Sequence, residues 1–102
     1  MVDVRGWLEA NQTALRLSGV EAEVVASDPT RPKPSQSIRL ESPGAMAEAI
    51  VWEGGECEVL YGRSPETVVV EHRRVESRPD LDAVMSDLLA YLTQASDHLT
   101  ET

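Results

Sequence analysis

The clearest structural pattern in the sequence is the segment Ala47-Glu-Ala-Ile-Val-Trp-Glu-Gly-Gly-Glu-Cys-Glu-Val-Leu-Tyr61. Two runs rich in apolar residues flank Gly54-Gly55, a dipeptide that suits a two-residue turn with positive φ. The pattern therefore predicts a β-hairpin in which residues 47–53 pair with residues 56–61. The expected register pairs Trp52 with Cys57 and Ile50 with Val59 on one face, and Glu53 with Glu56 and Val51 with Glu58 on the other.

Amphipathic helices are predicted on both sides of the strands. Residues 3–18 place apolar side chains at three- and four-residue spacings, with Asp3 suited to the N-cap and Gly19 to the helix end. A stronger helical pattern begins at Ser77 and continues through Leu81, Val84, Met85, Leu88, Leu92 and Ala95. The polar residues 96–102 are expected to fray at the end of this helix.

Three further strands are predicted around the hairpin, at residues 20–26, 37–41 and 67–75. The first two are joined by residues 27–35, where three prolines remove backbone donors and so predict an irregular loop. Short connections pair neighbouring strands antiparallel, and two amphipathic helices can cover one face of such a sheet. We therefore expect a single α+β domain over residues 1–102, with an antiparallel sheet of about five strands between an N-terminal and a C-terminal helix.

Acidity is the unusual property of the composition. Asp and Glu number 18 against 9 Lys and Arg, which leaves a formal net charge of −9 in a chain of 102 residues. Nucleic acids and anionic membranes need a basic surface, so we expect neither as a partner. The acidity either keeps the protein soluble or steers it towards a basic protein surface, and both interpretations stay open. Without a signal peptide or an apolar span, the sequence predicts a cytoplasmic protein.

Catalytic and metal-binding patterns are missing from the sequence. The two histidines, His72 and His98, do not have the spacing of metal ligands, and Cys57 is the single cysteine. Because Cys57 is predicted to point inward beside Trp52, a small core residue is favoured over a nucleophile paired with His72. We therefore expect a binding protein with no enzymatic activity, cofactor or metal.

The candidate partner-binding residues lie in the hairpin and in the proline-rich loop. They are Trp52, Glu53, Glu56, Glu58, Arg31 and Lys33. The glutamates form either a solvated face or a docking surface for a basic partner. Trp7 and Trp52 are interpreted first as core aromatics, although tryptophan is also enriched among interface residues that dominate affinity. The two basic residues belong either to a rigid connector or to a second contact point.

Several short segments of the sequence follow one another over most of the chain. They are the first helix with Trp7, then Asp28-Pro-Thr-Arg-Pro-Lys-Pro-Ser35, Val51-Trp-Glu-Gly-Gly-Glu-Cys-Glu58, Val70-Glu-His-Arg-Arg74 and Asp80-Leu-Asp-Ala-Val84. Together they resemble the TriTu family of bacterial immunity proteins. The resemblance implies a protein made alongside an antibacterial polymorphic toxin, an ADP-ribosyltransferase directed at the translation factor EF-Tu. It implies that the protein binds this toxin domain in the cytosol and blocks its active site or substrate approach.

Two other functions remain as alternatives. A small acidic chaperone for a secreted effector protein would have a similar size and charge, but such chaperones usually dimerise. We expect an immunity protein to be a monomer when it is free. A small-molecule binding or catalytic domain would need a polar cavity between the sheet and the helices, and we expect apolar side chains to fill that space.

Overall fold

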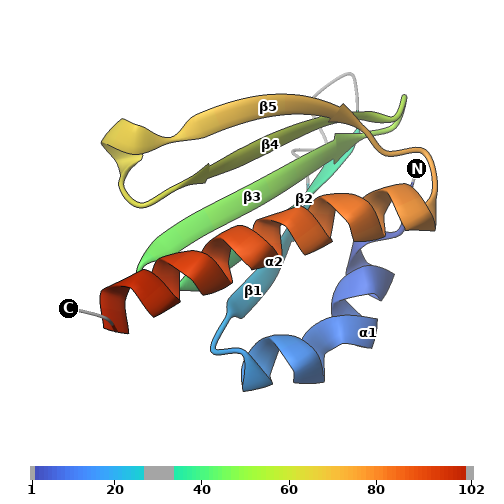
Figure 1. Ribbon diagram of the computed structural model, residues 1–102. Coiled ribbons are helices and arrows are strands. Elements are labelled where there is room, and N and C mark those ends of the chain that lie inside the picture. The colour runs from blue at the N-terminus through green and yellow to red at the C-terminus, as the bar shows by residue number, and fades with distance from the viewer. Residues whose placement is uncertain (1, 27–33, 101–102) are drawn as a thin grey trace.

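The computed structural model of the protein describes residues 2–26 and 34–100, with side chains as far as Gln94. Five strands form one antiparallel sheet in the order β1-β2-β3-β4-β5, and both helices lie on the same face of it (Figure 1). The elements are α1 (Val4–Leu17), β1 (Glu21–Ala26), β2 (Ser35–Ser42), β3 (Ala45–Trp52), β4 (Glu56–Gly62), a 3-10 helix (Pro65–Thr67), β5 (Val69–Arg74) and α2 (Arg78–Thr100). The predicted α+β fold, with its helix–five strands–helix order, is confirmed.

Helix α1 begins and ends where its capping residues were predicted. The Asp3 carboxylate accepts a hydrogen bond from the Gly6 N–H at 2.8 Å, which satisfies one of the backbone donors at the helix start. After the helix, Gly19 has a φ of 74°, a left-handed conformation that glycine adopts without strain. The helix buries Val4, Trp7 and Leu15, and it packs beside β1 and β2.

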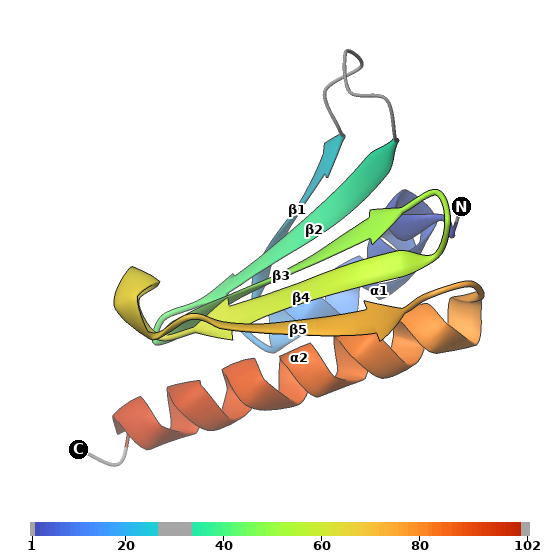
Figure 2. The same cartoon turned by 90° about the horizontal axis from the view of Figure 1, so that it is seen from above.

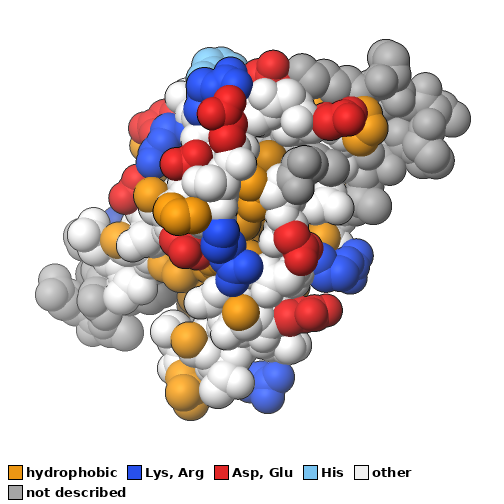
Figure 3. All heavy atoms as spheres, turned by 90° about the vertical axis from the view of Figure 1, so that its right-hand side faces the viewer, with side chains coloured by type: hydrophobic (Ala, Val, Ile, Leu, Met, Phe, Trp, Pro, Cys, Tyr) orange, Lys and Arg blue, Asp and Glu red, His pale blue; other side chains and the backbone are white. Residues whose placement is uncertain are grey.

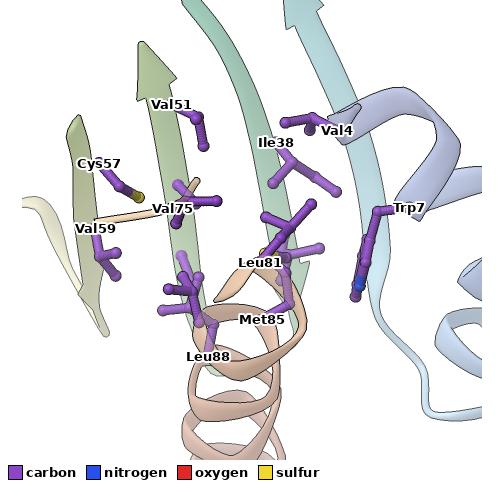
Figure 4. Packing of buried hydrophobic residues seen from close by; sticks show 14 of the residues in the cluster. Val4, Trp7, Ile38, Val51, Cys57, Val59, Val75, Leu81, Met85 and Leu88 are labelled. Atoms are coloured by element: carbon purple, nitrogen blue, oxygen red, sulfur yellow. The ribbon is translucent and has the colours of Figure 1, made fainter. Parts of the chain in front are cut away.

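Helix α2 contributes a single stripe of large apolar side chains to the core. The stripe consists of the buried residues Leu81, Val84, Met85, Leu88 and Leu92. It packs across β2 and β3, where Ile38 and Leu40 are buried as predicted (Figure 4). The facing positions of β3 are mostly alanines, which leave room for the longer side chains of the helix.

The boundaries of the last two elements differ from the prediction. Strand β5 begins at Val69 and not at Thr67, because Pro65–Thr67 forms a 3-10 turn in which Ser64 and Thr67 cap each other. Helix α2 continues to Thr100, so it includes residues 96–100 of the segment expected as a polar tail. That this segment frays stays a prediction.

The register of the β3–β4 hairpin is shifted by one residue from the predicted one. Val51 pairs with Cys57, and Ile50 pairs with Glu58. The reason is the turn, which has three residues: the Gly55 N–H donates to the Trp52 carbonyl at 2.9 Å, and Gly55 has a φ of 92°. A left-handed glycine at the third position is typical of three-residue hairpin loops. The two-residue turn we expected is therefore wrong.

The shift changes the face of every β3 side chain. Because side chains alternate along a strand, a slip of one residue turns each of them to the other side of the sheet. Val51 lies in the core with 0% exposure, whereas Ile50 and Trp52 lie half-buried on the side away from the helices. The expectation that Trp52 packs beside Cys57 in the core is therefore also wrong, since Cys57 remains inward.

The end of the hairpin is tied to the segment that leads into α2. The Gly55 carbonyl accepts a hydrogen bond from the Val75 N–H at 2.8 Å. The Arg74 guanidinium donates to the Gly54 carbonyl at 3.1 Å and to the Glu76 carboxylate at 2.6 Å. These bonds hold the turn in one position, so the side chains on either side of it have a firm backbone support.

Candidate partner-binding surface

The outer face of the sheet is the face opposite to both helices, and Figure 2 shows its strands side by side in chain order. Strand registers and side-chain alternation place on it Glu21, Glu23, Val25, Ser35, Ser37, Arg39, Glu41, Met46, Glu48, Ile50, Trp52, Glu56, Glu58, Leu60, Val70, His72 and Arg74. Within the described part of the chain, no helix covers these side chains. The outer face is therefore an open surface built on regular structure in the described part of the chain.

Apolar side chains lie at the centre of the outer face. Ile50 of β3 and Leu60 of β4 are half-buried by their neighbours, and Trp52 is half-buried at the end of β3. Val70 of the edge strand is 48% exposed and Met46 is 38% exposed. Apolar side chains left open on one face of a sheet are typical of protein–protein interaction sites.

Carboxylates lie among and around these apolar side chains and outnumber the basic groups. The acidic residues are Glu21, Glu23, Glu41, Glu48, Glu56 and Glu58, and the arginines are Arg39 and Arg74. Arg39 donates to Glu48 at 2.7 Å, and this hydrogen bond, with the charges of the nearby glutamates, raises the pKa of Arg39. The excess of negative charge favours approach of a basic protein surface.

The structure brings three of the predicted binding residues to the outer face. Glu58 lies opposite His72, and Glu56 lies opposite Arg74 on the edge strand. Trp52 is on the same side as both glutamates, whereas the sequence predicted it on the opposite side. Glu53 is exposed in the hairpin turn next to them.

Two of the predicted binding residues cannot be located, and three residues of the outer face were not predicted. Arg31 and Lys33 lie outside the described residues. Ile50, Leu60 and Val70 of the outer face were not predicted as site residues, because the expected register put Ile50 in the core. Along residues 45–52, small residues occupy the odd positions. This alternation could have indicated that Ile50 and Trp52 lie on the outer face.

Charges of both signs meet at the end of the molecule that carries the β3–β4 turn. Figure 3 looks at this end, where acidic and basic side chains are interspersed with hydrophobic atoms between them. Arg74, Glu76 and the Gly54 carbonyl form one such group around the turn. This end of the molecule is thus a mixed surface next to the acidic outer face.

Cys57 lies in the core between β4 and the helices, as predicted. Its side chain is 2% exposed. Burial raises the pKa of the Cys57 thiol from 9.0 to about 11, although the charge of Arg73, opposite it on β5, works in the other direction. A thiol of this kind stays protonated at neutral pH, so its geometry favours a packing role over a nucleophilic one.

The raised pKa of Cys57 predicts a loss of stability in alkali. Below pH 9 the thiol is protonated in both the folded and the unfolded chain; between pH 9 and about 11 the unfolded chain releases a proton that the folded chain keeps. The free energy of unfolding should fall by about 2–3 kcal/mol over this range from the thiol alone. Urea unfolding below pH 9 and near pH 11 measures the fall. The variant Cys57→Ala should lose less stability, and equal losses in both proteins would contradict the assignment.

Features of a metal site and of a membrane-spanning helix are both absent from the described ranges 2–26 and 34–100. No group of three or more His, Cys, Asp and Glu residues there could hold a metal ion. In the same part of the chain, no helix is long and apolar enough to cross a membrane.

The chain is therefore a small two-layer α+β protein in which helices cover one face of the sheet and the other face is open, with apolar and acidic side chains together on it. Residues 3–91 match the family model described as Immunity protein TriTu, and the chain therefore belongs to the TriTu immunity protein family. Its role is the neutralisation of a cognate toxin. No curated protein and no solved structure was found to match the chain.

Proposed function

We propose that the protein neutralises an antibacterial ADP-ribosyltransferase toxin domain by binding over its active site with the outer face of the sheet. Membership of the immunity family supports the neutralising role, and the family resemblance implies the toxin's activity. The observation that carries the choice of surface is the open outer face, where Trp52, Glu56 and Glu58 lie together.

Charge complementarity supports occlusion of the active site. An enzyme that binds a dinucleotide pyrophosphate presents positive charge in its cleft, because charged donors bind phosphate oxygens best. The carboxylates of the outer face carry negative charge, as the pyrophosphate does, and are therefore attracted to such a cleft. Trp52 stands beside them as a large apolar anchor, and aromatic anchors surrounded by polar groups dominate the affinity of many interfaces.

This mechanism needs recognition and no chemistry from the protein. The protein acts as a monomer in the cytoplasm of the bacterium that makes the toxin, without nucleic acid or membrane as a partner. A stable dimer in size-exclusion chromatography with light scattering would instead favour a chaperone for a secreted effector protein. Binding by a monomer predicts a complex with one copy of each protein.

A co-expression experiment tests the proposed function. The gene next to this one is cloned, its C-terminal domain is expressed alone, and growth is followed with and without this protein. We expect growth arrest that this protein relieves, together with loss of ADP-ribose transfer from NAD in the purified mixture. Toxicity without relief would refute the proposed function for that pair, and relief without loss of transfer would refute occlusion of the active site.

Charge reversal on the outer face is expected to weaken binding. The double variant Glu56→Lys and Glu58→Lys removes two carboxylates and adds two cations, so the affinity for the toxin domain should fall about tenfold, mainly through slower association. Association rates measured at low and high salt give the check. The wild type should lose rate as salt screens the attraction, and the variant should lose less.

The matched control is Glu9→Lys, because Glu9 is an exposed carboxylate on α1, away from the outer face. It should leave the affinity nearly unchanged. Wild-type binding that does not respond to salt or to the double variant would show that the acidic face is not the contact.

A further inference from the structure

A groove lies between the edge strand β5 and helix α2, on the inner side of the sheet. It arises because α2 packs across β2 and β3, so β4 and β5 extend beyond the helix (Figure 1). The groove has a volume of about 270 Å³, and Val59, Val84 and Leu88 line its floor. These three side chains are almost completely buried. The floor is therefore apolar.

Two tyrosines form the aromatic wall of this β5–α2 groove. The rings of Tyr61 and Tyr91 have centroids 4.8 Å apart and planes tilted by 58°. Tyr61 donates its hydroxyl proton to the Glu71 carboxylate at 2.7 Å, and this hydrogen bond raises the pKa of Tyr61. The phenol therefore stays neutral, and both half-buried rings keep an aromatic face available to a ligand.

The charges at the rim of the groove are only partly balanced. Arg73 donates to Asp87 at 3.0 Å, which pairs one cation with one carboxylate. Glu71 forms no ion pair with any residue in the described part of the chain, and its contact is the Tyr61 hydroxyl. The groove therefore combines an apolar floor, two aromatic rings and one uncompensated carboxylate.

We propose that the β5–α2 groove seats one long cationic side chain, an arginine or a lysine, supplied by the partner protein. Its methylene groups would lie on the apolar floor, as the stems of such residues do at other surfaces. Its charged head would meet the tyrosine rings and the Glu71 carboxylate, where cation–π attraction and a charge-assisted hydrogen bond act together. β5 is the edge strand of the sheet, so no further strand of the described chain closes the entrance.

The identity of the partner rests on the proposed function, whereas the chemistry of the groove does not. A first experiment therefore uses no toxin. N-acetyl-arginine methylamide is titrated into the protein, and the ring signals of Tyr61 and Tyr91 are followed by NMR. The neutral analogue with citrulline in place of arginine has nearly the same shape and serves as the matched ligand.

We expect the arginine compound to shift the tyrosine signals with an affinity about tenfold above that of the citrulline compound. The variant Glu71→Gln should reduce this preference to about threefold, because it removes the carboxylate and leaves the two rings in place. Equal shifts with both compounds, or a preference that Glu71→Gln leaves undiminished, would overturn the inference whether or not the protein neutralises a toxin.

A second experiment uses the cognate toxin domain. Tyr91→Ala should weaken binding about tenfold, whereas Tyr91→Phe should not, because the ring and not the hydroxyl meets the cation. The control Asp82→Asn changes a carboxylate of α2 that pairs with Arg78 outside the groove. If the wild type binds the toxin and Tyr91→Ala binds equally well, the groove inference fails while the proposed function stands. If the wild type does not bind, the proposed function fails and the arginine titration alone decides on the groove.

Discussion

Replacing Trp52 by alanine is expected to weaken binding of the toxin domain by about 30-fold or more. A central aromatic anchor contributes about 2 kcal/mol or more to an interface, and each 1.4 kcal/mol is a factor of about ten in affinity. Trp52 lies on the outer face and outside the buried core, so the free energy of unfolding should fall by only about 1 kcal/mol, which is typical of a point substitution. Calorimetric titration with the purified toxin domain and urea unfolding measure the two quantities.

Leu17→Ala is the matched control for Trp52→Ala. Leu17 is an apolar side chain on α1 that is 84% exposed, far from the outer face in the fold. Its removal should change neither affinity nor stability appreciably. Unchanged toxin affinity in Trp52→Ala would mean that another surface makes the contact.

Replacing Trp7 by alanine is expected to have the opposite effect, a large loss of stability. Trp7 is 3% exposed and stands between α1 and the sheet next to Val4 and Ile38 (Figure 4). Removing a buried tryptophan typically costs about 3–5 kcal/mol, a large part of the total stability of a small domain. Urea unfolding followed by the fluorescence of the remaining Trp52 gives the midpoint and slope.

The control here is Trp7→Phe, which keeps an aromatic ring and should lose less stability. Binding of the toxin domain by the folded fraction of Trp7→Ala should match that of the wild type. A loss of stability below about 1 kcal/mol would contradict the packing seen around Trp7.

The order of helices and strands could be predicted from the sequence, because it depends on patterns among a few neighbouring residues. Asp3 and Gly19 bracket α1, and the stripe from Leu81 to Leu92 has only one interpretation, a helix with one buried face. Alternation in β2 placed Ile38 and Leu40 inward correctly. These signals were sufficient for the α+β class because each depends on periodicity and capping, and not on long-range packing.

The register of the hairpin depends on a single backbone angle, and for that reason it could not be obtained from the pattern. Gly54-Gly55 fits a two-residue turn as well as the second half of a three-residue turn. Both strands contain apolar residues on both faces, with Ile50 and Trp52 on one and Ala49 and Val51 on the other. The packing of α2 on small alanines decides between them, and this contact joins parts of the chain far apart in sequence.

Only part of the candidate surface could be predicted, because the positions of some of its residues depend on the hairpin register. The glutamates of β4 were placed correctly on a solvent-facing side, since charged side chains rarely enter a core. Trp52 was placed on the wrong side because the expected two-residue turn set a register one residue away from the observed one. The β5–α2 groove could not be foreseen, because it depends on where the helix crosses the sheet, which no local pattern encodes.

The chain order of the sheet has a consequence for folding during synthesis. Each strand pairs with its neighbour in the sequence, so the sheet can grow by successive hairpins with short loop closures, which favours fast folding. Helix α2 follows all five strands in the chain, yet it covers the middle of the sheet. A nascent chain that has left the ribosome only as far as β5 therefore lacks the apolar side chains that α2 packs on β2 and β3, and docking of the helix is the step that ends this vulnerable interval.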